Sequence, residues 1–264
     1  MKVNKLIGIV GGVGPHAGID LFRKIIDQTI AKTDQEHLPV ALLSFPGEVE
    51  DRTSFILGHT SNNPAFEIAK IIKKLEELGA NIVAIACNAA HSPQIYNVIV
   101  EEMRKIKCRV KLIHLINEVA EFIMVNYSHI KKVGVLCTNG TYKSKIYPDI
   151  FRQKGIDVIL PDEKLQKMVH NSICDPAYGI KAQSEPVTDM AKRELKEAIN
   201  YLHKKGAEAI ILGCTEIPLA IKEKKKGKTF IIDPSMILAR ALIKDVDINK
   251  LKPYLPYSID CKIH

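Results

Sequence analysis

The sequence predicts an α/β protein made of two doubly wound parallel-sheet domains, which an internal duplication relates by a pseudo-twofold axis. Two observations predict this fold. Short apolar strands alternate with amphipathic helices along the chain, a pattern typical of parallel sheets covered by helices on both faces. Landmarks of the first half also recur in the second half at a nearly constant distance, which indicates a duplicated unit.

Four strands are predicted in the first half, each a short apolar run beside a turn or a helix. The runs are KLIGIV at 5–10, PVALLSF at 39–45, NIVAIAC at 81–87 and VKLIHL at 110–115. Between the strands, apolar residues recur every three to four positions, which predicts helices at 19–30, at 64–79 and from about Ser92. Gly79 suits the C-terminal end of the helix at 64–79.

The second half repeats this pattern in register. KKVGVLCTNGT resembles the first strand with its turn, and Gly134 lies 126 residues after Gly8 (134 − 8). GAEAIILGCTEIP resembles GANIVAIACNAAH, and Cys214 lies 127 residues after Cys87 (214 − 87). FIIDPSMILARALI then follows the second cysteine as KLIHLINEVAEFI follows the first. Chance similarity of apolar strands explains one match but not the constant spacing.

We therefore expect a first domain of residues 1–112 plus 234–264 and a second domain of residues 113–233. Ligands of open parallel sheets bind at the carboxyl ends of the strands, and Cys87 and Cys214 both follow such ends. If the halves face each other, the two thiols converge on one active-site cleft between the domains.

Composition excludes several classes of protein. The 264 residues are 46% hydrophobic, as in globular proteins, and no apolar run is long enough to span a membrane. The N-terminus is interpreted as a first strand, not a signal peptide. Six cysteines without a C-x-x-C pair favour reduced thiols in the cytoplasm and no metal site.

The net charge of +8 suits a small anionic substrate better than nucleic acid, because the lysines are scattered over apparent helix faces. The one dense run, KEKKKGK at 222–228, is predicted to be a solvent-exposed loop. We expect neither a nucleic-acid nor a membrane partner.

Two facing cysteines are suited to racemisation without a cofactor. One thiolate removes the α-proton of an amino acid, and the other thiol delivers a proton to the opposite face. Cysteine suits both steps because its ordinary pKa is close to neutral pH and shifts readily. Such a site must also stabilise the negative charge that develops on the substrate carboxylate.

Two turns and two polar residues are candidates for binding that carboxylate. The glycine turn GGVGP, with Gly12, leads into a helix N-terminus, and CTNGT, with Thr138, occupies the equivalent turn of the second half. Asn88 and Thr215 follow the two cysteines directly. Capping of the turns is the alternative role for Asn88 and Thr215.

The chain resembles the cofactor-independent aspartate/glutamate racemase family, and in particular its aspartate racemase branch. The markers of this resemblance are IGIVGGVGP at 7–15, DRTSFILG at 51–58, ACNAAH at 86–91, YGIKA at 178–182 and GCTEIPL at 213–219. The resemblance implies two α/β domains, a homodimer, no pyridoxal phosphate and no metal. It also implies that Cys87 and Cys214 are the acid/base pair.

Binding roles follow from the same resemblance. Arg52 would bind the second carboxylate of the substrate, Asn88 and Thr215 would bind the α-carboxylate, and Lys181 would come from a mobile segment over the cleft. Glu216, where glutamate racemases have histidine, favours aspartate. From the residues alone, Glu216 is a base or orienting group for Cys214, or a carboxylate that favours a helix N-terminus.

This chain departs from the family pattern at two positions. Ala89 replaces a threonine that commonly contacts substrate, and His16, Ala17 and Gly18 replace leucine, alanine and threonine after the glycine turn. Both changes remove a hydroxyl near the expected site, so the substrate could differ from aspartate; glutamate and cysteate are candidates.

The remaining residues of interest have structural interpretations. Cysteines outside the paired motifs are expected to be structural, namely Cys108, Cys137, Cys174 and Cys261. His91 either orients the first cysteine turn through a hydrogen bond or starts the next helix. A surface ion pair is the alternative role for Arg52, and solvent exposure for Lys181. Asp233 and Pro234 suit the start of the last helix.

Other functions stay open at this point. Hydantoin racemase and maleate isomerase chemistry could use the same cysteines, although Arg52 and Lys181 argue against an uncharged hydantoin. A protein that binds an acidic metabolite without turnover is a further alternative, and the two retained thiols argue against it.

Overall fold

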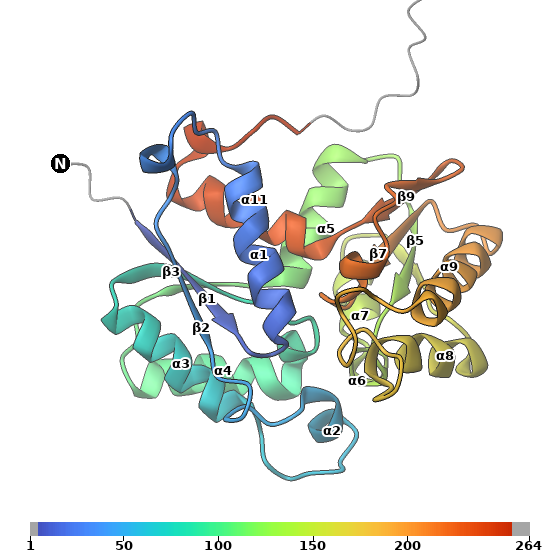
Figure 1. Cartoon of the computed structure of the whole chain (residues 1–264), viewed down its shortest axis with the longest axis horizontal. Helices are drawn as coiled ribbons and strands as arrows, with labels where there is room; N and C mark the ends of the chain where they lie inside the picture. The colour runs from blue at the N-terminus through green and yellow to red at the C-terminus, as the bar shows by residue number, and fades with distance from the viewer. Residues whose placement is uncertain (1–4, 255–264) are drawn as a thin grey trace, which may run out of the picture.

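The computed structural model describes residues 5–254, which form two sheets that lie beside each other, each flanked by helices (Figure 1). The strands are β1 (Leu6–Gly11), β2 (Val40–Ser44), β3 (Ala80–Ile85), β4 (Lys111–Ile113), β5 (Lys132–Leu136), β6 (Asp157–Ile159), β7 (Ala209–Leu212), β8 (Lys225–Lys226) and β9 (Thr229–Ile232). The α/β class predicted from alternating strands and helices is confirmed.

The helices follow the strands as the apolar periodicity predicts. They are α1 (Pro15–Gln28), α2 (Arg52–Ile56), α3 (Ala65–Glu77), α4 (Pro93–Lys105), α5 (Leu115–Asn126), α6 (Asn139–Ser144), α7 (Ile146–Arg152), α8 (Glu163–Cys174), α9 (Asp189–Lys204), α10 (Ile217–Ala220) and α11 (Pro234–Val246). None of the helices within residues 5–254 combines the length and apolar character that a membrane crossing requires.

The two sheets share one topology. The first has the strand order β2-β1-β3-β4 and the second has the order β6-β5-β7-β9-β8. Without the edge strand β8, the orders are equivalent, and all remaining pairs are parallel. The duplication predicted from the sequence is therefore present in the fold.

Side-chain packing repeats with the topology. In each half, a Cβ built on the glycine of the first strand would meet the same two residue types, a leucine from the helix before the third strand of that half and an alanine at or just before that strand. The contacts are Gly8 with Leu75 and Ala80, and Gly134 with Leu202 and Ala207. The partners are 127 residues apart (202 − 75 and 207 − 80), the same spacing as between the two cysteines.

The last helix returns to the first half. α11 packs against α1 and α5. Figure 1 shows α11 beside α1, although the two helices come from opposite ends of the sequence. One buried apolar cluster runs from the first sheet through α5 and α11 to the second sheet, and two further clusters cover the outer faces. This packing supports a first domain that includes α11, although the exact boundaries stay a prediction.

One local prediction was wrong. The lysine run at 222–228 is not only a loop, because Lys225 and Lys226 form β8 and pair antiparallel with Phe230 and Thr229 of β9. The charged side chains are tolerated because β8 is a short strand at the sheet edge.

Candidate active site

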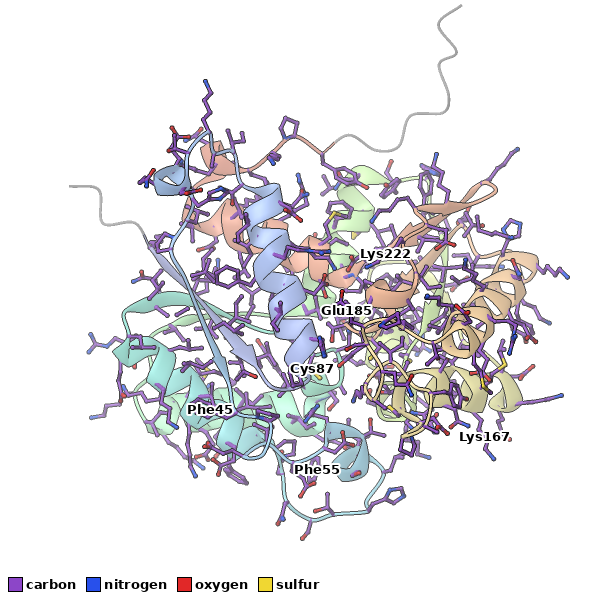
Figure 2. The ribbon with its side chains drawn as sticks, in the orientation of Figure 1. Phe45, Phe55, Cys87, Lys167, Glu185 and Lys222 are labelled. Atoms are coloured by element: carbon purple, nitrogen blue, oxygen red, sulfur yellow. The ribbon has the colours of Figure 1, made fainter. Side chains whose placement is uncertain are left out.

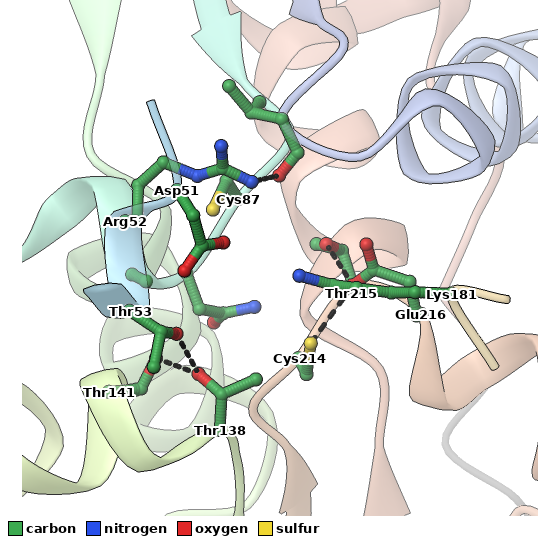
Figure 3. Close-up of a pocket in the computed structure, with 13 residues that line it drawn as sticks. Asp51, Arg52, Thr53, Cys87, Thr138, Thr141, Lys181, Cys214, Thr215 and Glu216 are labelled. Atoms are coloured by element: carbon green, nitrogen blue, oxygen red, sulfur yellow. Dashed lines mark hydrogen bonds between the residues drawn. The ribbon is translucent and has the colours of Figure 1, made fainter. Parts of the chain in front are cut away.

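The two cysteines follow the ends of equivalent strands and face one cavity. Cys87 lies two residues beyond β3 and Cys214 two residues beyond β7. Their exposed fractions are 7% and 8%. Both line a cavity of about 290 Å³, to which they contribute from two sides (Figure 3). Cys87 lies near the middle of the molecule (Figure 2).

Most residues predicted for the site line this cavity. They are Arg52, Cys87, Asn88, Ala89, Thr138, Lys181, Cys214, Thr215 and Glu216. Gly12 does not, and lines a second, more open cavity that shares Asp51, Arg52, Lys181 and Glu216 with the first. The paired strand ends thus bring together residues that are up to 164 positions apart (216 − 52).

Arg52 is buried, not part of a surface ion pair. It starts α2 and is 7% exposed; its guanidinium donates to the carbonyl oxygens of Glu50 at 3.1 Å and Val13 at 2.9 Å. Its buried Nε has no hydrogen-bond partner within residues 5–254. Burial alone would lower the pKa of the guanidinium, but attraction to Cys87 and Asp51 outweighs it and raises the pKa.

Asn88 offers a second buried donor. It is 2% exposed, and its Oδ1 accepts a hydrogen bond of 2.6 Å from the hydroxyl of Tyr147. Its Nδ2 has no partner in the described part of the chain. An unsatisfied buried donor costs about 1–3 kcal/mol. Arg52 and Asn88 therefore both offer N–H groups to an acceptor that enters the cavity.

Cys214 and Glu216 form a hydrogen-bonded pair. The thiol donates to Glu216 Oε2 at 2.9 Å, and the Thr215 hydroxyl lies 3.3 Å from the same oxygen and 3.1 Å from the carbonyl oxygen of Ala86. Burial and the negative charge of Glu216 raise the pKa of Cys214 well above its ordinary value. Glu216 makes no side-chain cap bond to α10, so the structure favours the orienting role over the helix-terminus role.

Lys181 brings a second cation to the cavity. Burial against the cavity opposes its charge, but attraction to Glu216, Cys174 and Cys214 is stronger and raises the pKa of the ammonium. Figure 3 shows the side chain reaching between the two cysteine turns. As a whole residue Lys181 is solvent-exposed, and it also lines the cavity.

The segment that carries Lys181 is attached to both halves. The backbone N–H of Lys181 donates to the carbonyl oxygen of Ile173, near the end of α8, at an N···O distance of 3.0 Å. Three residues later, the hydroxyl of Ser184 lies 2.7 Å from His16 Nε2 at the start of α1. The predicted mobility of this segment stays a prediction.

The sequence analysis missed other cavity residues, which are Val13, Asp51, Thr53 and Thr141. Asp51 caps α2 by accepting from Ser54 N at 2.8 Å. Burial would raise its pKa, but the Ser54 amide, Arg52 and Lys181 together lower it, which favours the carboxylate. The aspartate at position 51, a residue type that favours the start of a helix, was the available signal for this cap.

Gly12 of the first glycine turn does not line the cavity with the cysteines, whereas Val13 of the same turn does. Gly12 has a φ of +75° and leaves no room for a side chain, because a Cβ would lie 2.8 Å from Phe45 N. Gly18, at the position of the missing threonine, packs against Leu42 and Gly11 and does not line the cavity. Of the two departures from the family pattern, only Ala89 therefore alters the cavity wall.

The remaining candidates fall outside the cavity. Cys137 is 1% exposed within the core, and burial raises its pKa to about 12. Burial likewise raises the pKa of Cys174 to about 11. Cys108 is half-buried, with its pKa raised by burial, and Cys261 lies outside the described residues. His91 donates from Nδ1 to the carbonyl oxygen of Cys87 at 2.7 Å, as the orienting role requires.

Charge in the cavity is balanced between the two cations and two carboxylates, Arg52, Lys181, Asp51 and Glu216. Within residues 5–254 no group of three or more His, Cys, Asp or Glu residues is arranged to hold a metal ion. Two thiols, two cations and a buried amide can bind a small dianion and move protons at its two faces.

Comparisons with known proteins identify the family of this chain. The family model described as Asp/Glu/Hydantoin racemase matches residues 10–242. Aspartate racemase from Picrophilus torridus has a similar structure, with a TM-score of 0.76 and 31% identity, over 92% of this chain and 94% of that chain.

Two curated relatives are similar in sequence over most of the chain. The broad specificity amino-acid racemase RacX of Bacillus subtilis is 27% identical over 90% of this chain and 96% of its own length. A glutamate racemase of Bacillus cereus is 25% identical over 91% of this chain and 80% of its own length. The chain therefore belongs to the Asp/Glu/hydantoin racemase family and is an enzyme of the amino-acid racemase type.

Proposed function

We propose that this chain interconverts the L- and D-forms of a small acidic amino acid, with aspartate as the leading substrate, by a two-base mechanism that uses Cys87 and Cys214. One observation carries the proposal. Two thiols from equivalent strand ends face a single buried cavity that also contains unpartnered N–H donors and two cations.

Substrate binding uses the donors that lack partners. The carboxylates of the substrate would accept hydrogen bonds from Arg52 Nε and Asn88 Nδ2, both of which are buried. Lys181 would neutralise part of the second negative charge. Hydrogen bonds to charged groups contribute about 1.5–3 kcal/mol each, so these contacts favour a dianionic ligand over a neutral one.

Proton transfer follows from the different neighbours of the two cysteines. Cys87 lies beside the Arg52 guanidinium and is the candidate base. The Cys214 thiol keeps its proton in a hydrogen bond to Glu216 and is the candidate acid. The Cys87 thiolate removes the α-proton, and the electron pair of the C–H bond moves toward the carboxylate. Cys214 then protonates the opposite face, which leaves Cys87 as thiol and Cys214 as thiolate. The reverse reaction uses them in exchanged roles, and neither direction needs a cofactor.

Several observations support aspartate. The cavity between the two cysteines is small, which favours a small substrate. The similar structure at 31% identity is an aspartate racemase, whereas one curated relative is a glutamate racemase and another has broad specificity.

A substrate panel tests the proposal. The purified protein is incubated separately with L-aspartate, L-glutamate, L-cysteate and maleate, and the products are separated by chiral chromatography. We expect D-aspartate to form with the highest kcat/KM of the panel. Turnover of maleate to fumarate without formation of any D-amino acid would replace racemisation by isomerisation, and binding without turnover would leave a metabolite-binding protein.

Two further expectations belong to the proposal. A homodimer is predicted, and light scattering during gel filtration measures it, with a mass near twice 29.5 kDa. We also predict a reducing compartment such as the cytoplasm, because both thiols must remain reduced. Oxidation by diamide should abolish turnover and dithiothreitol should restore it.

A further inference from the structure

Tyr147 connects the two cysteine turns without lining the cavity. It belongs to α7 in the second half, whereas its hydrogen-bond partner Asn88 follows the first cysteine. It is 1% exposed and is among the largest fully buried side chains. Burial raises the pKa of its phenol well above the ordinary value, so the hydroxyl keeps its proton and can donate.

This hydrogen bond determines which side of the Asn88 amide faces the substrate. The Tyr147 hydroxyl donates to Asn88 Oδ1 at 2.6 Å, so the amide nitrogen of Asn88 is on the side away from this hydroxyl. That nitrogen is buried and has no other partner within residues 5–254, and Asn88 lines the cavity. If the amide were rotated, its oxygen would face the substrate carboxylate, and two acceptors would meet without a proton between them.

The ring of Tyr147 also constrains the second cysteine turn. A Cβ built on Gly213, the residue before Cys214, would lie 3.2 Å from the Tyr147 ring carbon Cε2 and 2.9 Å from Val135. The backbone that leads to Cys214 therefore passes close to the ring. Tyr147 contacts the residue after one cysteine and the residue before the other.

The hydroxyl is not needed for packing. Phenylalanine would fill the same space, and a buried hydroxyl is tolerated only when it is hydrogen-bonded. The described residues provide one hydrogen bond for it, the bond to Asn88.

We propose that Tyr147 is a positioning residue for racemisation: its hydroxyl holds the Asn88 amide with the N–H groups toward the substrate carboxylate. This inference rests on the proposed function, and its test separates the two. It predicts that removal of the Tyr147 hydroxyl impairs turnover only when Asn88 is present.

A double-mutant cycle tests this coupling. The kcat and KM for aspartate are measured for the wild type, Tyr147→Phe, Asn88→Ala and the double variant. We expect Tyr147→Phe to reduce kcat/KM about tenfold, mainly by raising KM, and to reduce it by less than about twofold in the Asn88→Ala background. Tyr127→Phe is the matched control, because it removes the hydroxyl of another buried tyrosine, whose partner is Tyr254. It should leave KM unchanged.

Two kinetic results would overturn the proposal. One is a wild-type KM in Tyr147→Phe. The other is an equal loss in both backgrounds, which would mean that the tyrosine acts through Gly213 packing instead.

If the wild type turns over no amino acid, the proposed function fails, and the positioning role is decided in the unliganded protein. The ¹H–¹⁵N signals of the Asn88 side-chain amide should then shift and broaden in Tyr147→Phe but not in Tyr127→Phe. Unchanged signals in Tyr147→Phe would overturn the positioning role.

Discussion

Cys87 and Cys214 occupy equivalent positions in the two halves but have different neighbours. Arg52 lies beside Cys87, whereas the Cys214 thiol donates to Glu216. A duplicated fold would give two identical thiols, and a two-base reaction needs one protonated and one deprotonated carrier at its start. The residues around each cysteine supply this difference, not the strands that position it.

The charge of Glu216 should be visible in the pH dependence of turnover. Burial and this negative charge raise the pKa of Cys214, so Glu216→Gln should lower the pKa of the thiol. For the enantiomer from which Cys214 removes the proton, the rise of kcat/KM with pH should move to lower pH. Stopped assays in both directions between pH 6 and pH 10, with Glu118→Gln as control, measure the shift. An unchanged profile would exclude the coupling.

At the scale of elements, the two glycine turns allow the halves to approach each other closely. A Cβ on Gly14 would lie 2.3 Å from Glu216 Oε1, and a Cβ on Gly140 in α6 would lie 2.8 Å from Thr53 Cα in α2. Each turn thus meets a cavity residue contributed by the opposite half. The close approach gives these two glycines a packing role, and the carboxylate cradle predicted from the sequence stays a prediction.

Alanine at the two glycines should have different effects. Gly14→Ala displaces the flexible end of Glu216 from Cys214, so kcat/KM should fall at least about tenfold with little loss of stability. Gly140→Ala meets backbone, so it should cost about 1–3 kcal/mol of unfolding free energy.

Thermal unfolding and kinetics of both variants measure these effects. Gly47→Ala is the control, because nothing lies within 4 Å of the added methyl group. Full activity in Gly14→Ala would contradict this account of the turn.

The short turn that begins the α4 region should make stability pH-dependent. Burial and the neighbouring His114 lower the pKa of His91 from 6.5 to about 3, so folded His91 stays neutral where the unfolded chain binds a proton. The stability that neutral His91 contributes is complete above the pKa of histidine in the unfolded chain, and it is lost as the pH falls from about 6.5 toward 3.

Between pH 7 and pH 5 this loss amounts to about 2 kcal/mol. Urea unfolding should therefore show that the free energy of unfolding decreases from pH 7 to pH 5, and that this decrease is smaller by about 2 kcal/mol in His91→Gln than in the wild type. Equal decreases in the two proteins would contradict the assignment.

The sequence predicted the elements that depend on local patterns. Apolar runs and helical periods located the central strands and the paired cysteines, because burial on both faces leaves a continuous apolar signature. The Asn88–Tyr147 bond was not predictable in this way. It depends on a contact between residues of opposite halves, and Tyr147 lies 59 positions from Asn88.

At the scale of the whole molecule, a buried charge cluster fastens the returning chain to the first half. Lys24 in α1 contacts Asp20 and lies 2.6 Å from Asp233, which follows β9 and caps α11. The exposed fraction of the side chain is 13% for Lys24, 4% for Asp20 and 9% for Asp233. Asp233 and Pro234 thus start the last helix as the sequence predicted, and Asp233 also connects it to α1.

Lys24→Met should therefore destabilise the fold by about 3 kcal/mol, because buried Asp233 would lose its ion pair with Lys24 and Asp20 would keep only the more distant Arg23, 3.7 Å away. Lys105→Met is the control. Lys105 also pairs with two carboxylates, Glu101 and Glu102, but is 58% exposed, so solvent screens these pairs and their loss should have little effect on stability. Chemical denaturation measures both, and equal losses would contradict the role of the buried cluster.

The central claim is that the two halves each contribute one proton carrier to the same carbon atom. The most direct measurement is incorporation of deuterium at the α-carbon of L-aspartate in deuterated water, followed by NMR with chiral analysis, for the wild type, Cys87→Ala and Cys214→Ala. The account predicts deuterium incorporation with inversion in the wild type and loss of inversion by at least about 10³-fold in each variant. Inversion that survives in either variant, or a wild type that exchanges no α-proton, would contradict it.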